Sequence, residues 1–196
     1  MPVATTAKKA IRRRVIALRD ALSASERGQQ ASEITAKLLT LPQFLSANTV
    51  AAYASFGSEL DTDPFLAGVL NTGKRLLLPR VDSERRALHF HRVTELEGAF
   101  LKGPWGIREP DPTRCAEADI REIDFMLVPG VAFTRRCERL GYGGGFYDGA
   151  IGDIRDDAAR VAAAFDLQIV DTLPVETHDR RVGLVVTRSG SYSADH

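Results

Sequence analysis

A buried-strand pattern that leads into a glycine-rich loop limits the fold of this chain more than any other feature. Residues 125–128 (FMLV) are apolar throughout and are closed by Pro129 and Gly130. Residues 139–148 (RLGYGGGFYD) follow, with four glycines within five positions. Glycine tolerates positive φ, so consecutive N–H groups of such a loop can point into one concavity. We therefore expect a central strand, a tight loop and a helix over residues 146–154.

The residues around the glycines indicate a nucleotide site. Arg139 precedes the loop and could pair with phosphate charge, whereas Asp148 follows it and could hold Mg²⁺. The rings of Tyr142, Phe146 and Tyr147 suit a flat heterocycle, although the same rings could pack against the sheet. The loop matches neither the Walker A nor the dinucleotide fingerprint. A plain strand-to-helix turn is therefore the structural alternative.

Composition excludes several classes of protein. With 196 residues, of which 44% are hydrophobic and 27% charged, the chain fits one globular domain that we expect to span residues 1–196. Its 26 Lys and Arg balance its 26 Asp and Glu, so no overall field draws it to nucleic acid or to an anionic membrane. No apolar run is long enough to span a bilayer, and Cys115 and Cys137 lack C-x-x-C spacing. We expect a cytoplasmic protein with both cysteines as thiols, and no nucleic-acid or membrane partner.

A basic segment opens the chain, with six Lys and Arg residues before the first acid, Asp20. Such a segment also occurs in mitochondrial transit peptides and in nucleic-acid-binding helices. Ile11, Val15, Leu18 and Leu22 nevertheless recur at helical spacing, as in a helix that buries one face. We expect a helix over residues 6–21 that belongs to the folded domain.

The order of the expected elements predicts an α/β fold. Ser23 and Glu26 form a capping box for a second helix, which ends at Pro42. Asp63, as N-cap, and Gly73 frame a third helix. Because a strand precedes and follows that helix, we expect a parallel sheet with ligands at the carboxyl ends of its strands. The expected strands cover residues 49–54, 75–78, 87–93, 125–128, 160–165 and 184–187.

Two local patterns allow both a structural and a functional interpretation. His89 and His91 share one face of the expected strand over residues 87–93, as a two-histidine metal site would require. No third ligand lies nearby in sequence, so we expect both to face solvent. Trp105 stands between chain breakers in residues 103–110 and either plugs a hydrophobic cluster or walls a ligand pocket.

Short motifs distributed over nearly the whole chain have a specific order and spacing. They are residues 8–12 (KKAIR), 58–62 (SELDT), 78–80 (LPR), 105–110 (WGIREP), 128–133 (VPGVAF), the glycine loop and residues 174–179 (PVETHD). Together they resemble the 5-formyltetrahydrofolate cyclo-ligase family, also called methenyltetrahydrofolate synthetase. The resemblance implies a three-layer α/β sandwich with a mainly parallel central sheet, of the NagB/RpiA/CoA-transferase type.

The resemblance also implies a reaction. It is the ATP-dependent, irreversible closure of 5-formyltetrahydrofolate to 5,10-methenyltetrahydrofolate, with release of ADP and phosphate. The formyl oxygen attacks the γ-phosphate, and the nitrogen across the gap then closes the ring. The protein must mainly position the reactants and neutralise charge. We expect a monomer that uses ATP, a reduced folate and Mg²⁺.

By matching position, the resemblance implies roles for individual residues. Glu59 would accept hydrogen bonds from the pterin or orient the formyl-bearing nitrogens, and Asp148 and Asp179 would bind Mg²⁺. The implied ATP-binding residues are Lys8, Lys9, Ala10, Ile11, Arg12, Arg139, Leu140, Gly141, Tyr142, Gly143, Gly144, Gly145, Phe146 and Tyr147. The implied substrate-binding residues are Ala54, Glu59, Trp105 and Phe146. Without the resemblance, Lys8 and Arg12 could equally be solvated charges on one helix face.

Four positions depart from the usual pattern of the family. Thr134 and Cys137 stand where an aspartate and then a glycine are usual, and the non-glycine residue suggests a changed loop. Gly149 replaces a basic residue and Gly183 replaces an acid. These departures support an alternative, a divergent relative on the same fold that binds a nucleotide, a folate or a phosphorylated metabolite.

Overall fold

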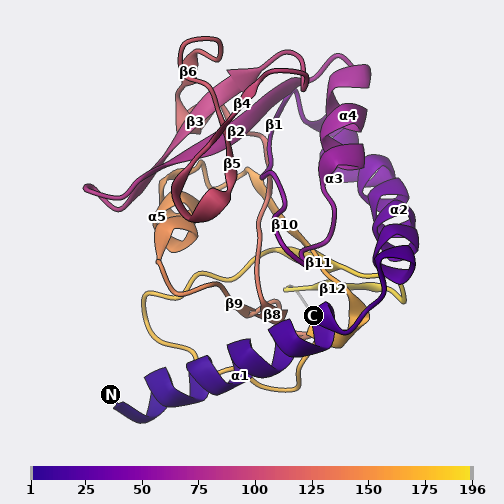
Figure 1. Ribbon diagram of the computed structural model, residues 1–196, viewed down its shortest axis with the longest axis vertical. Coiled ribbons are helices and arrows are strands. Elements are labelled where there is room, and N and C mark those ends of the chain that lie inside the picture. Colours follow the sequence, from indigo (N-terminus) through magenta and orange to yellow (C-terminus); the bar gives the residue numbers. More distant parts are fainter. Residues whose placement is uncertain (1, 195–196) are drawn as a thin grey trace.

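The computed structural model describes residues 2–194, which form a central sheet with helices on both faces (Figure 1). The main sheet has the strand order β12-β11-β10-β7-β1-β2-β3-β6. The inner strands β11, β10, β7, β1 and β2 run parallel, and the remaining strands pair antiparallel at the edges. The expected α/β class with a mainly parallel sheet is therefore confirmed. The strands are β1 (Thr49–Ala51), β2 (Arg75–Asp82), β3 (Ala87–Val93), β6 (Glu117–Ala118), β7 (Phe125–Leu127), β10 (Ala159–Ala163), β11 (Leu184–Val186) and β12 (Ser191–Ser193).

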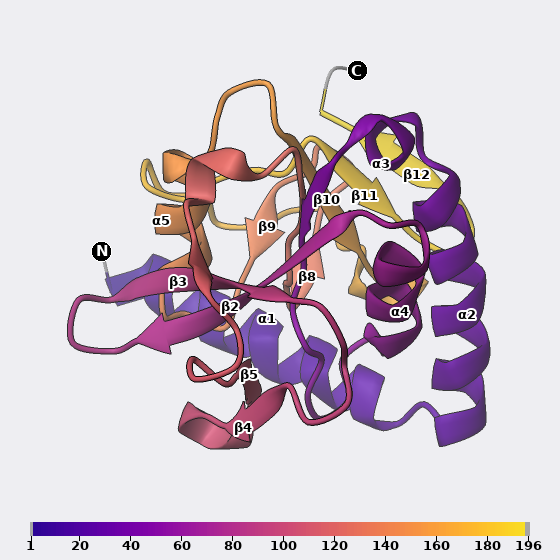
Figure 2. The ribbon, with the colours of Figure 1, turned by 90° about the horizontal axis from the view of Figure 1, so that it is seen from above.

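Successive residues of the inner strands are buried on opposite faces of the sheet. Val50 and Phe125 belong to the core under helices α2 (Ala24–Thr40), α3 (Pro42–Ser46) and α4 (Asp63–Asn71). Their neighbours Ala51 and Met126 belong to the core under α5 (Phe146–Asp153). Figure 2 shows α2 and α4 on one side of the sheet and α5 on the other. Both faces are covered, which explains why these strands carry no polar positions.

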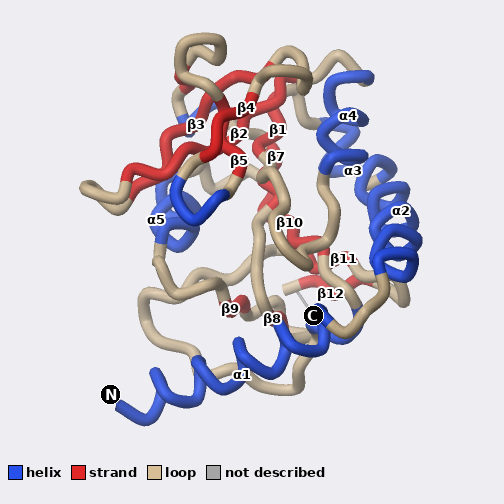
Figure 3. The backbone as a smooth tube through the Cα atoms, in the orientation of Figure 1, coloured by secondary structure: helices blue, strands red, loops and turns tan. Residues whose placement is uncertain are grey.

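Helix α1 (Pro2–Asp20) packs on the segments that follow the carboxyl ends of β7 and β10. Val15 is fully buried there, against Val131 and Leu140 near the hairpin of β8 (Ala132–Phe133) and β9 (Arg139–Leu140). The expectation of a wholly buried stripe is wrong at Leu18, which is 48% exposed. Figure 3 shows loops in the space between the main sheet and α1. This end of the sheet therefore holds both the loops and the basic helix.

Several boundaries and short elements differ from the expectation. Thr62 rather than Asp63 is the N-cap of α4, and Pro42 opens the short helix α3 as well as ending α2. The hairpins β4 (Phe100–Lys102) with β5 (Arg108–Pro110) and β8 with β9 were not predicted, because strands of two or three residues without a longer apolar run give no detectable pattern. The capping box of α2 is confirmed, with Glu26 N donating to Ser23 Oγ. Three 3₁₀ turns complete the described elements: η1 (Pro104–Gly106), η2 (Ile120–Glu122) and η3 (Asp166–Gln168).

The two histidines of β3 do not both face solvent as expected. His91 is buried, and its Nδ1 lies 2.8 Å from the carbonyl oxygen of Cys115. His89 Nδ1 lies 2.7 Å from Glu117 Oε1. The antiparallel neighbour β6 covers one histidine and supplies an acid to the other, a contact that the spacing of the histidines alone does not reveal. None of the described helices combines the length and apolar character needed to cross a membrane.

Candidate active site

A cavity of about 810 Å³ lies between α1, the glycine loop and the second half of β2. Its size is typical of a small-molecule site. All residues that the family resemblance singled out line it, except Ala10 and Ile11. Ala10 is exposed, and Ile11 packs into the cluster around Val15 instead. Lys8 and Arg12, one helical turn apart, both face the cavity.

Lys8 is a buried cation held by two acids. Its Nζ lies 2.6 Å from Asp179 Oδ2 and 2.7 Å from Glu176 Oε2. Burial alone would lower the pKa of Lys8, but the hydrogen bonds and charges of Asp179 and Glu176 outweigh it and raise the pKa. Burial alone would raise the pKa of Asp179, but the hydrogen bond from Lys8 opposes this effect, and the pKa is lowered. The three groups are therefore all ionised at neutral pH.

The glycine loop is shaped by both backbone angles and close approach. Gly143 (φ +103°) and Gly145 (φ +77°) have backbone angles that favour glycine. A Cβ at Gly144 would lie 2.6 Å from the ring of Phe146. Arg12 Nε donates to the carbonyl oxygen of Gly141 at 2.7 Å, which ties α1 to the loop. Gly145 is the N-cap of α5, so the loop ends at the positive end of a helix dipole.

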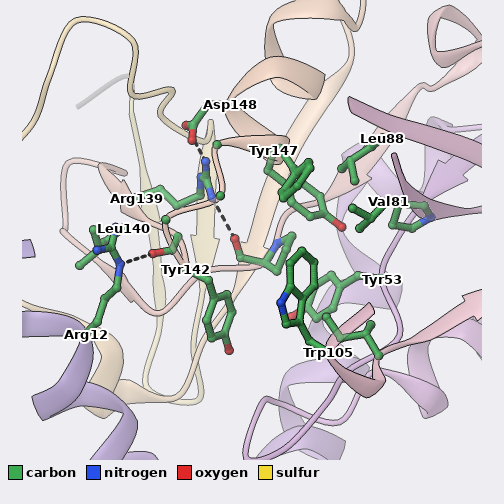
Figure 4. A pocket seen from close by; sticks show the side chains of 18 of the residues that line it. Arg12, Tyr53, Val81, Leu88, Trp105, Arg139, Leu140, Tyr142, Tyr147 and Asp148 are labelled. Atoms are coloured by element: carbon green, nitrogen blue, oxygen red, sulfur yellow. Dashed lines mark hydrogen bonds and ion pairs between the residues drawn. The ribbon is translucent and has the colours of Figure 1, made fainter. Parts of the chain in front are cut away.

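Arg139 joins the glycine loop to the start of α5. Its Nη2 lies 2.6 Å from Asp148 Oδ1, and its Nη1 donates to the carbonyl oxygen of Pro129 at 3.3 Å. The side chain of Arg139 is 3% exposed and that of Asp148 is 22% exposed. Figure 4 shows this pair beside Leu140 and Arg12, on the same side of the cavity. One guanidinium nitrogen, Nε, is buried without a partner among the described residues.

Glu59 is a buried carboxylate at the centre of a polar chain. Its Oε1 accepts from Tyr142 Oη at 2.7 Å, and its Oε2 accepts from the amide of Phe56 at 3.1 Å. Arg19 Nη2 donates to Tyr142 Oη at 3.0 Å. Burial raises the pKa of Glu59, although these hydrogen bonds and the charge of Arg19 oppose the shift. The sequence singled out Glu59 but gave no signal for Arg19, which lies 40 residues away and reaches the chain only through the fold.

Aromatic and aliphatic side chains form the other side of the cavity. Figure 4 shows Val81 and Leu88 there, with Trp105 nearby. The Trp105 ring is 6.3 Å from that of Phe146, and Trp105 is 70% exposed at φ +57°. Tyr147 Oη is buried without a hydrogen-bond partner among the described residues, and burial raises its pKa. Both groups line the cavity wall. A bound ring system can cover the exposed indole of Trp105 and form a hydrogen bond with the unpaired hydroxyl of Tyr147.

Acidic groups near the cations could hold a metal ion. Glu176, His178 and Asp179 offer ligand atoms within 4.8 Å of one another, the one such group of three in residues 2–194. Asp148 Oδ1 accepts from the amide of Arg180 at 3.0 Å as well as from Arg139. Carboxylate oxygens are the donors that Mg²⁺ prefers. The chemistry of these donors therefore fits the expected magnesium.

Tyr53 and Glu109 also line the cavity, although neither was predicted from the sequence as a site residue. Tyr53 lies just after β1, and burial raises its pKa. Glu109 Oε1 accepts from the amide of Val81 at 3.0 Å, at the part of β2 that extends beyond β1. The only signals in the sequence were that Tyr53 lies at the end of a buried strand and that Glu109 lies in the motif of residues 105–110.

Fold and cavity together define an α/β protein with a small-molecule site, and comparisons with known proteins give its family. A sequence model described as the 5-formyltetrahydrofolate cyclo-ligase family matches residues 4–188. The chain belongs to the 5-formyltetrahydrofolate cyclo-ligase family, so the resemblance and the enzyme class that it implied are confirmed.

Relatives at moderate identity support this assignment. The 5-formyltetrahydrofolate cyclo-ligase of Escherichia coli (strain K12) is 33% identical over 176 residues, which cover 87% of this chain and 94% of the relative. That of Mycolicibacterium smegmatis is 34% identical over 145 residues, which cover 73% and 75%. The NMR structure of Aquifex aeolicus 5,10-methenyltetrahydrofolate synthetase superposes with a TM-score of 0.84 at 30% identity, covering 96% of this chain and 93% of that one.

The four departures from the family pattern lie outside the cavity. Thr134 Oγ1 accepts from the amide of Glu138 at 3.2 Å and closes the turn between β8 and β9. Cys137 adopts φ +61° in that turn, so it keeps a left-handed conformation that usually favours glycine. Both cysteines are buried thiols, as expected. Thr134 and Cys137 therefore change a hairpin beside the site, whereas Gly149 lies within α5 and Gly183 lies just before β11. None of the four changes the lining of the cavity.

Proposed function

We propose that the cavity binds ATP and 5-formyltetrahydrofolate together and catalyses ATP-dependent closure to 5,10-methenyltetrahydrofolate. One observation carries the proposal: a single cavity joins a glycine loop with cations on one side to a wall of rings on the other (Figure 4), and the buried carboxylate of Glu59 is part of its lining. Phosphates need the first side and flat heterocycles need the second.

The triphosphate of ATP lies on the glycine loop in this proposal. Its oxygens accept hydrogen bonds from backbone N–H groups of residues 141–145 and of the first turn of α5. Arg12 and Lys8 neutralise its charge. Both cations already have partners, so binding exchanges those partners for phosphate oxygens. The two residues thereby orient the γ-phosphate toward the interior of the cavity.

The reduced folate occupies the aromatic side. Trp105 and Phe146 cover its ring system, and Glu59 accepts hydrogen bonds from its N–H groups. Tyr142 and the amide of Phe56 hold the Glu59 carboxylate in place. A fixed acceptor of this kind orients the formyl-bearing nitrogens relative to the γ-phosphate.

Asp148 and Asp179 are the residues that we assign to Mg²⁺, with Glu176 beside them. When bound, the ion would offset phosphate charge and polarise the phosphoryl oxygens. Lys8 shares the oxygens of Asp179 and Glu176, so it competes for the same site.

The reaction proceeds by two displacements. The formyl oxygen bonds to the γ-phosphorus, and ADP leaves with the electrons of the broken P–O bond. The nitrogen across the gap then bonds to the formyl carbon and loses its proton to solvent, and phosphate leaves as the C–O bond breaks. Lys8, Arg12 and Arg139 stabilise the charge that develops on the transferred group.

Absorbance of the methenyl product tests this function, with purified protein, Mg-ATP and 5-formyltetrahydrofolate, and with ATP omitted as the control. We expect ATP-dependent product and one phosphate released per ring closed. Folded protein that binds ATP but forms no product would support the divergent binder instead. The proposal includes a single domain, a monomer and a cytoplasmic location, and a solution mass near 21.4 kDa tests the monomer.

A further inference from the structure

Arg86 reaches the glycine loop from the turn between β2 and β3. Its Nη2 donates to the carbonyl oxygen of Gly144 at 3.1 Å, and it approaches the position that a Cβ of Gly145 would occupy to 4.0 Å. Arg86 itself is exposed and lies at the rim, outside the lining of the cavity. The motifs that resemble the family do not include this turn, so no sequence pattern indicated that Arg86 lies near the glycine loop.

The backbone of Arg86 supports a role beyond a surface charge. Its φ is +54°, a left-handed region that residues with a Cβ rarely adopt. Such angles persist where the surrounding structure fixes them, and they cluster at ligand sites. Arg86 is the last residue of the turn before β3, and from there its side chain reaches the carbonyl of Gly144.

The charges around the loop show what Arg86 can add. Lys8 is paired with two acids and Arg139 with Asp148. Arg12 and Arg86 differ from these cations, because the bonds that they make to the loop end on neutral carbonyl oxygens, those of Gly141 and Gly144. Among residues 2–194 they are the two arginines bound to glycine-loop carbonyls, one from α1 and one from the β2–β3 turn.

We propose that Arg86 is a further phosphate-binding arginine, which exchanges the Gly144 carbonyl for a phosphate oxygen of bound ATP. A charged oxygen is the stronger partner for a guanidinium, which bonds to phosphate in a bidentate manner. Arg12 and Arg86 then hold the triphosphate from two different elements. The inference rests on the proposed placement of ATP at this loop.

Equilibrium binding of Mg-ATP in the absence of folate tests the proposal, with Arg86→Ala compared with Arg85→Ala. Arg85 is the matched control, since it is the neighbouring exposed arginine and contacts Asp82 rather than the loop. We expect Arg86→Ala to weaken ATP binding about tenfold, as for the loss of one charge-assisted hydrogen bond. Arg85→Ala should change it by less than about twofold. Equal affinities for the two variants would overturn the proposal.

Arg86→Gln separates phosphate binding from simple bracing of the loop. Glutamine can still donate to the Gly144 carbonyl but carries no charge. We expect it to bind ATP as weakly as Arg86→Ala, with a smaller dependence on salt than the wild type. Wild-type affinity in Arg86→Gln would show that the neutral hydrogen bond suffices, and the proposal would be wrong. Because binding is measured without folate, the result is independent of whether the wild type forms methenyl product.

Discussion

The two sides of the cavity are prepared for ligands in opposite ways. On the side of α1 and the glycine loop, the buried cations already have partners: Lys8 contacts two carboxylates, and Arg139 lies 2.6 Å from Asp148. On the aromatic side, Trp105 is 70% exposed and Tyr147 Oη has no hydrogen-bond partner among the described residues. The buried charges of one side are therefore paired before the ligand arrives, although Arg139 Nε has no partner among the described residues, and the other side presents uncovered and unpaired groups.

This difference predicts different consequences of mutation. A ligand on the charged side must exchange existing ion pairs, so changes there affect both the fold and binding and depend on pH. A ligand on the aromatic side covers exposed rings, so changes there reduce affinity while leaving the fold intact. Glu59 also lines the cavity, and its carboxylate already accepts hydrogen bonds from Tyr142 and the amide of Phe56, so changes there should alter folate binding and its pH dependence.

Arg139→Ala should have the largest effect, because it leaves the charge of Asp148 without its partner. We expect the free energy of unfolding to fall by about 3 kcal/mol, the lower end for a buried pair, since Asp148 is 22% exposed. The value of kcat/KM for ATP should fall about a hundredfold through loss of charge stabilisation. Urea denaturation and steady-state kinetics measure the two effects.

The double variant Arg139→Ala with Asp148→Ala is the control for that experiment. Removing both charges should restore much of the lost stability while activity stays low. Recovery of activity together with stability would mean that the pair is only structural.

Lys8→Ala should have the next largest effect on ATP, about thirtyfold in KM. The cation also keeps the pKa of Asp179 below its ordinary value of 3.8, against the effect of burial. The wild type therefore has stability from this pair above about pH 4 that is lost as the pH falls through the lowered pKa. In Lys8→Ala this part of the acid dependence should vanish from denaturation curves. An unchanged curve would show that the ion pair contributes nothing measurable.

The sequence predicted the strands of the inner sheet and the residues that line the site better than it predicted the contacts between those residues. Apolar runs such as residues 125–128 indicate strands buried on both faces, because a strand covered by helices on both sides buries every side chain. Motif positions identified Glu59, Arg139 and Trp105, all of which line one cavity.

What the sequence could not predict depends on contacts between distant segments. Arg19 reaches Tyr142 across 123 residues, and Lys8 reaches Glu176 across 168. No local pattern encodes such pairs. Short hairpins such as β4 with β5 were missed because their three-residue strands show neither alternation nor an apolar run like that of residues 125–128. His91 was wrongly expected to face solvent. Its partner, the carbonyl of Cys115, comes from the segment just before β6, and the pattern of β3 alone does not reveal that β6 pairs with it.

Glu59→Gln should lower kcat/KM for the folate about tenfold and leave ATP affinity unchanged, because a neutral amide is a weaker acceptor. Burial raises the pKa of Glu59, so the folded protein holds this proton more tightly than the unfolded chain. Ionisation above that pKa costs stability, and the variant should be at least as stable as the wild type at neutral pH. A less stable variant, with ATP binding also reduced, would indicate misfolding instead.

Tyr142→Phe sharpens the same test through pH. Activity that needs the Glu59 carboxylate falls as the pH decreases through the raised pKa. The hydrogen bond from Tyr142 lowers this pKa, so its removal should move the acidic limb of kcat/KM to higher pH. Glu59→Gln should lack that limb. An acidic limb at the same pH in all three proteins would assign it to another group.

Trp105→Ala should have the smallest effect, and it tests the aromatic side alone. Because the indole is 70% exposed, its removal should change the free energy of unfolding by less than about 0.5 kcal/mol. The KM for the folate should rise about fivefold through loss of ring contact, whereas the KM for ATP should stay constant. Trp105→Phe, which keeps a ring opposite Phe146, should recover most of the affinity. If Trp105→Ala instead destabilised the protein as Arg139→Ala does, both sides of the cavity would be structural and the contrast between them would fail.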